Sequence, residues 1–90
     1  MSATLIVRHP VADYATWRPV YDEVGALRDQ HGCTYERVLR LPTDGNDVVA
    51  IHDFPTVEQA EAFAADPALK AAMERSGVSG APRIEIFVSA

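Results

Sequence analysis

Three histidines are the side chains in this sequence best suited to moving a proton: His9, His31 and His52. An imidazole titrates near neutral pH, so it can accept or donate a proton under physiological conditions. His52 lies in the apolar stretch VVAIHDF, and it is a candidate general base if its ring faces a cavity. The alternative is a structural histidine, hydrogen-bonded to a backbone carbonyl or to Tyr35.

The other two histidines have their own alternatives. His9 precedes Pro10 at the end of a predicted strand, which suits a surface or capping histidine, although Trp17 nearby would favour a substrate-binding role. His31 precedes Gly32 at the end of a predicted helix, where the helix dipole favours a protonated ring. The predicted strand directions put His9 at one end of the sheet and the other two histidines at the opposite end. No three-histidine metal site is therefore expected, because every ligand must lie within about 2 Å of the metal.

Aromatic residues gather in the segment HPVADYATWRPVYDE, residues 9–23. Tyr14, Trp17 and Tyr21 recur at helical spacing and therefore share roughly one helix face. Such a face usually packs into a core. Trp17 and Tyr21 would equally suit the flat apolar wall of a site for an aromatic substrate, with the Tyr21 hydroxyl as polar anchor and second candidate acid or base.

Two further candidate binding residues, Tyr35 and Arg37, are predicted to share one face of a strand. Arg37 would neutralise a phenolate or an enolate, or else pair with Glu85 or Asp53. The single cysteine, Cys33, is expected to be a buried apolar residue, since one cysteine allows neither an internal disulfide nor a cysteine-based zinc site. We find no Ser-His-Asp order and no glycine-rich phosphate loop.

The hydrophobic pattern that positions these residues predicts the order βαββαβ. Four strands are expected at 3–9, 33–41, 48–54 and 83–89, with turn residues at 42–47. The first helix is expected to begin after Thr16 as N-cap, which keeps Pro19 in the first turn, and to end at His31 with Gly32 as a left-handed cap. The second is expected after Thr56 and to restart at Asp66-Pro67.

Right-handed crossovers between these elements give a ferredoxin-like α+β fold, with a four-stranded antiparallel sheet and both helices on one face. The other face would be bare. The last strand places Arg83, Glu85 and Phe87 together on one of its sides, so neither sheet face is wholly polar. A second copy packed on the bare face best explains this, and we predict a homodimer.

Ninety residues are expected to form one domain, residues 1–90. The net charge of −5 and the scattered basic residues argue against nucleic-acid binding. The sequence offers neither a charged leader followed by an apolar run nor an apolar stretch of roughly 20 residues, so we expect no membrane association. With its lone thiol, the protein is predicted to be cytoplasmic.

The stretch DFPTVEQAEAFAADPALKAAM, residues 53–73, together with the helix opening DYATWRPVYDE, resembles the dimeric α/β-barrel proteins. The nearest relatives by this resemblance are the antibiotic-biosynthesis-monooxygenase-like group and small cyclase-like proteins. The resemblance covers nearly the whole chain. It implies a site between helices and sheet that Phe54 faces, and with it His52, which has the same strand parity.

The resemblance implies a cofactor-free monooxygenase acting on an aromatic or polyketide-like molecule, with His52 or Tyr21 abstracting a proton. The alternatives are a polyketide cyclase or isomerase of the same fold and a non-catalytic dimeric binding module. In the haem-degrading branch a tryptophan stands where this chain has Phe54, and the iron-ligating histidine stands where it has Met73. The first strand also lacks that branch's asparagine, so we expect no haem.

Overall fold

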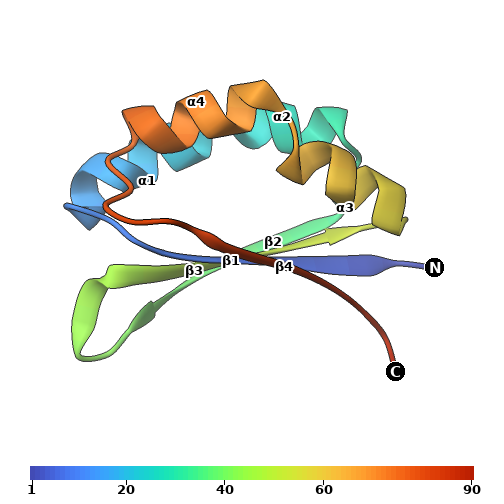
Figure 1. Ribbon diagram of the computed structural model, residues 1–90, viewed down its shortest axis with the longest axis horizontal. Coiled ribbons are helices and arrows are strands. Elements are labelled where there is room, and N and C mark those ends of the chain that lie inside the picture. The colour runs from blue at the N-terminus through green and yellow to red at the C-terminus, as the bar shows by residue number, and fades with distance from the viewer.

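The computed structural model describes all residues from Met1 to Ala90, and it contains eight helices and strands. In chain order they are β1 (Ala3–Pro10), α1 (Tyr14–Glu23), α2 (Gly25–Gln30), β2 (Tyr35–Leu41), β3 (Asp44–Phe54), α3 (Val57–Ala64), α4 (Pro67–Arg75) and β4 (Arg83–Val88). Figure 1 labels these elements along the chain. None of the helices is both long and apolar enough to cross a membrane.

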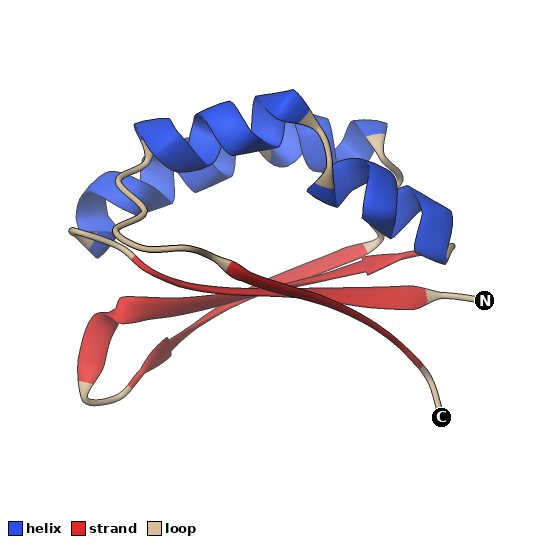
Figure 2. Ribbon diagram, viewed as in Figure 1, coloured by secondary structure: helices blue, strands red, loops and turns tan.

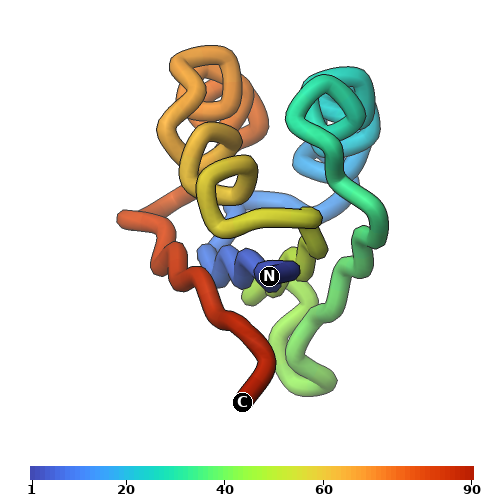
Figure 3. The backbone as a smooth tube through the Cα atoms, turned by 90° about the vertical axis from the view of Figure 1, so that its right-hand side faces the viewer, coloured from blue at the N-terminus to red at the C-terminus, as the bar shows by residue number.

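The strands form one antiparallel sheet in the order β2-β3-β1-β4. All helices lie on one face of this sheet and leave the other face bare (Figure 2). Seen from the side, α1 and α2 form one column above the sheet and α3 and α4 form a second column beside it (Figure 3). The predicted ferredoxin-like α+β fold is thus confirmed.

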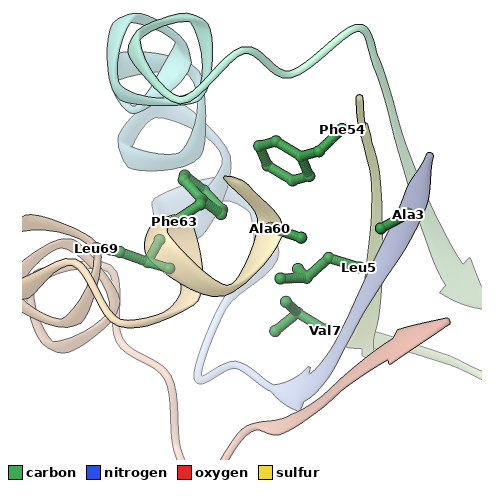
Figure 4. Close-up of a cluster of buried hydrophobic side chains, with 7 residues drawn as sticks. All are labelled: Ala3, Leu5, Val7, Phe54, Ala60, Phe63 and Leu69. Carbon is green, nitrogen blue, oxygen red and sulfur yellow. The ribbon is translucent and has the colours of Figure 1, made fainter. Parts of the chain in front are cut away.

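The hydrophobic core lies between the sheet and the helices. Alternate β1 residues face the helices, and Leu5, opposite His52 in the register, is completely buried. Phe54 and Phe63 meet with ring centroids 5.5 Å apart, and neither is more than 1% exposed. Figure 4 shows this cluster, in which α3 and β1 supply most of the side chains.

The first helix differs from its prediction at both ends. It begins at Tyr14, because the backbone carbonyl of Asp13 already accepts from the amides of Thr16 and Trp17, at 3.2 and 3.0 Å. Pro19 therefore lies inside α1, and only the hydrogen bond to the carbonyl four residues earlier is lost. The predicted single helix is also divided at Val24. The left-handed cap at Gly32 is confirmed, with φ of 85°.

The β2–β3 hairpin differs from its prediction in register. A loop over 42–47 would set Arg37 opposite His52. Instead β3 begins at Asp44, Leu41 pairs with Asp44 and Arg40 already pairs with Val48, so extra β3 residues bulge between these pairs. Because side chains alternate along a strand, this shift places Glu36 opposite His52.

Tyr35 and Arg37 share one face of β2, as predicted, but it is the bare face, so the expected place of Tyr35 beside His52 was wrong. Neither ion pair considered for Arg37 forms: Glu85 pairs with Arg83 at 3.0 Å, and Asp53 accepts a hydrogen bond from Thr4 Oγ1 at 2.7 Å. Cys33 is only half-buried rather than buried, and its thiol donates to the Tyr35 carbonyl oxygen at 3.2 Å.

Candidate functional site

A cavity of about 40 Å³ lies between the helices and the sheet. Its wall is mostly apolar and comes from β1, β3 and all four helices. The lining residues are Val7, His9, Trp17, Val20, Tyr21, Val24, Arg28, Ala50, His52, Phe63, Leu69, Ala72, Met73 and Ser76. Four of the predicted site residues, His9, Trp17, Tyr21 and His52, are therefore brought to one cavity.

His52 and Tyr21 are joined by a buried hydrogen bond. The Tyr21 hydroxyl oxygen lies 2.9 Å from His52 Nε2 and 2.6 Å from Glu36 Oε2. An ionised carboxylate only accepts, so the single Tyr21 proton is donated to Glu36. His52 must then donate Nε2–H to the Tyr21 oxygen, which we assign as its tautomer.

The second ring nitrogen of His52 is left without a partner. Its Nδ1 is buried, accepts no hydrogen bond and, in the assigned tautomer, carries a lone pair. Burial, and secondarily the charge of Arg28, lower the pKa of His52 from its ordinary 6.5 to about 4. The ring is therefore neutral at pH 7 and can accept a proton.

Arg28 holds Tyr21 from the other side. Its guanidinium carbon lies 4.1 Å from the centre of the Tyr21 ring, and its Nη1 donates to the Tyr21 carbonyl oxygen at 3.0 Å. Burial, together with the hydrogen bond to Glu36, raises the pKa of Tyr21. Tyr21 thus keeps its proton at neutral pH and is a donor in this arrangement.

His9 occupies the other end of the cavity, on the same sheet face as His52 but opposite Val48 in the register. It is 3% exposed, so it is neither a surface nor a capping residue, and neither of its ring nitrogens has a hydrogen-bond partner. Burial lowers its pKa. No three His, Cys, Asp or Glu side chains converge in a way that would hold a metal.

Aromatic rings connect the two histidines. Trp17 meets His9 edge-on at 5.6 Å and stacks on Tyr21 at 4.8 Å, and Tyr21 in turn lies 6.0 Å from the His52 ring. The helical spacing seen in the sequence thus produces a continuous aromatic wall along α1. Both ends of that wall carry unpartnered imidazole nitrogens.

Three predicted site residues do not line the cavity. Phe54 points to the helix side, as expected, but it is fully buried against Phe63 in the core. Tyr35 and Arg37 lie on the bare face of the sheet. His31, at the end of α2, contacts Asp66 through Nε2 at 2.8 Å, and this hydrogen bond lowers the pKa of the Asp66 carboxyl.

Sequence reasoning missed Arg28 and Glu36. Arg28 lies two helical turns after Tyr21, so the spacing that grouped the aromatic residues would also have placed it on their face. The position of Glu36 opposite His52 depends on the hairpin register, and no local sequence pattern signals the bulge between the Arg40–Val48 and Leu41–Asp44 pairs.

A groove of about 370 Å³ adjoins the cavity, between α4 and β4. Leu69 and Met73 line both spaces and form part of the wall between them. Methionine is flexible and adapts its shape readily.

No family model matches the sequence, and no curated protein matches it. Solved structures do resemble it. SnoaB from Streptomyces nogalater, a cofactor-independent oxygenase, is 16% identical with a TM-score of 0.82, and the match covers 99% of this chain and 93% of that chain. A protein from Bordetella bronchiseptica, assigned as an antibiotic biosynthesis monooxygenase, is 13% identical with a TM-score of 0.83, over 99% of this chain and 97% of that one.

A third similar structure, assigned in the same way, comes from Caulobacter crescentus CB15. It is 18% identical with a TM-score of 0.79, over 99% of this chain and 90% of that chain. At these identities the likeness concerns the fold. The resemblance noted in the sequence is confirmed at that level: this chain has the ferredoxin-like fold of the antibiotic-biosynthesis-monooxygenase-like proteins.

Proposed function

We propose that this protein is a cofactor-independent monooxygenase for an aromatic or polyketide-like molecule. The observation that carries the proposal is the buried, unpartnered Nδ1 of His52, a residue that lines a cavity walled by Trp17 and Tyr21. The shared fold with SnoaB, a cofactor-independent oxygenase, supports the reaction class.

His52 is the base in this scheme. Its Nδ1 removes a proton from a phenolic oxygen or from a carbon next to a carbonyl, and the resulting electron-rich anion reacts with dioxygen. A lowered pKa does not prevent this, because the substrate anion formed beside the ring stabilises the imidazolium. The cost of charging His52 is thereby offset in part at the moment of transfer.

Two aromatic rings and His9 would hold the substrate. A planar molecule packs on the wall formed by Trp17 and Tyr21, where ring stacking contributes beyond simple burial. His9, at the far end, would hydrogen-bond a ketone or hydroxyl oxygen, which would satisfy a nitrogen that is otherwise unpaired. The favoured substrate therefore carries an oxygen at each end of a flat ring system.

Space for such a substrate requires the groove as well as the cavity. Small-molecule sites usually measure about 300–1,000 Å³, far more than the 40 Å³ cavity but close to the 370 Å³ groove. We propose that Met73 moves aside and lets the rings pass from the groove to His52.

A homodimer through the bare sheet face is part of the same proposal. Phe87 is 49% exposed there, and Tyr35, Leu39, Ile6 and Ile51 lie on the same side. A second copy would cover these apolar side chains. Tyr35 and Arg37 would then contact the partner instead of the substrate.

The test is oxygen uptake with anthrone and with a naphthohydroquinone, after subtraction of autoxidation. We expect uptake that saturates with substrate in the wild type and falls by roughly 10²–10⁴-fold in His52→Gln. His31→Gln is the matched control, because His31 lies outside the cavity. Conversion without oxygen uptake would indicate the cyclase or isomerase, and no conversion of any panel member would favour the binding module.

A further inference from the structure

The buried pair of His52 and Tyr21 is connected to the protein surface by Glu36. Glu36 is an exposed residue of β2, directly opposite His52 in the register, and it does not line the cavity. We propose that Glu36 receives the proton that His52 takes from the substrate, through a relay over the Tyr21 hydroxyl. This inference rests on the function proposed above.

The hydrogen bonds give the relay a direction. Glu36 Oε2 lies 2.6 Å from the Tyr21 oxygen, within the short range of charge-assisted bonds between a hydroxyl and a carboxylate. The Tyr21 oxygen accepts from His52 Nε2 at 2.9 Å. Each donor therefore points outward, from the cavity toward Glu36.

The proton balance of the relay closes without another reactant. The substrate proton forms a bond with His52 Nδ1, while the Nε2–H bond breaks and its proton passes to the Tyr21 oxygen. The original Tyr21 proton then moves to the Glu36 carboxylate. The result is a substrate anion, a neutral His52 with Nδ1–H, a neutral Tyr21 and a neutral Glu36. Reversal of these steps returns the proton to the oxygenated product.

The charges around His52 explain why the proton should move on to Glu36. A full positive charge on buried His52 is costly, and the Arg28 guanidinium over the Tyr21 ring adds repulsion. Arg18 lies 5.3 Å from the centre of the same ring. The carboxylates of Glu36 and Asp53 act in the opposite direction and favour a protonated His52. The relay lets the positive charge leave the cavity and cancel the negative charge of Glu36.

The first test requires no substrate. Nitrogen-15 NMR of the His52 ring at pH 7 is expected to show proton attachment at Nε2. In Glu36→Gln the side-chain amide can donate to Tyr21, so the preference for Nε2–H is expected to weaken. Glu61→Gln, which changes an exposed α3 carboxylate, is the control and should leave the tautomer unchanged. A wild-type His52 protonated at Nδ1 would overturn the relay.

The second test measures turnover of anthrone. Glu36→Gln is expected to lower kcat roughly tenfold or more with little change in KM, because Glu36 does not line the cavity. Glu61→Gln should match the wild type. If His52→Gln is impaired and Glu36→Gln is not, the relay is wrong and the proposed function stands. If His52→Gln turns over as fast as the wild type, the proposed function itself fails.

Discussion

The buried state of His52 makes the stability of the fold depend on pH. Its pKa is about 4 in the folded chain and near 6.5 when exposed, so the unfolded state binds more protons between these values. The contribution of His52 to stability is therefore fully present above pH 6.5 and declines as the pH falls toward 4. The 2.5-unit difference corresponds to about 3 kcal/mol in total, of which about 2 kcal/mol is lost between pH 7 and pH 5.

Urea unfolding of the wild type and of His52→Gln at pH 7, 6 and 5 measures this contribution. Carboxylates and His9 titrate in both proteins. The difference between the two proteins in the pH dependence of their unfolding free energies therefore measures the contribution of His52. We expect the wild type to lose about 2 kcal/mol more than the variant between pH 7 and pH 5. Equal pH dependence in the two proteins would refute the assignment of His52 as a buried neutral ring.

Four other predictions concern the core, the turn at Gly32, the wall between cavity and groove at Met73, and the dimer. Phe63→Ala should lower the free energy of unfolding by about 3–5 kcal/mol, and a loss below 1 kcal/mol in urea would contradict its place in the core. Gly32→Ala should lower the free energy of unfolding by about 1–2 kcal/mol or more in the same assay, because φ is 85° and an added Cβ would lie 2.6 Å from Gln59 Nε2. An unchanged free energy of unfolding would argue against this geometry. Met73→Ala should lower KM for anthrone by opening the wall to the groove, and an unchanged KM would place entry elsewhere. Phe87→Glu should convert a dimer to a monomer in light scattering, whereas a monomeric wild type at micromolar concentration would rule out the dimer.

Local chemistry explains why most of the fold could be predicted. The caps at Thr56 and Asp66 were predicted from residue type, and both accept from backbone amides, those of Gln59 and Ala68, at 3.1 and 2.9 Å. The start of α1 could not be predicted in this way. Pro19 lies on the solvent-exposed side of α1, where the lost hydrogen bond is tolerated, so the proline did not mark the first turn.

The part of the site that depends on local sequence patterns could also be predicted. Trp17 and Tyr21 follow from helical spacing, and the helix-side position of His52 follows from its strand parity with Phe54. Tyr35 was expected near His52, but the β2–β3 register depends on a bulge between the Arg40–Val48 and Leu41–Asp44 pairs, and this bulge turns Tyr35 to the bare face. That bulge arises from pairing between two strands, which neither segment encodes alone. The position of Glu36 opposite His52 could therefore not be predicted from the sequence.

Anaerobic exchange of the anthrone methylene protons with D₂O tests the central claim most directly, because proton removal by His52 is separated from the reaction with oxygen. We predict that the wild type accelerates exchange well above the rate in buffer, while His52→Gln returns it to that rate. His31→Gln should exchange as fast as the wild type. Equal exchange by the wild type and His52→Gln would contradict the assignment of His52 as the base.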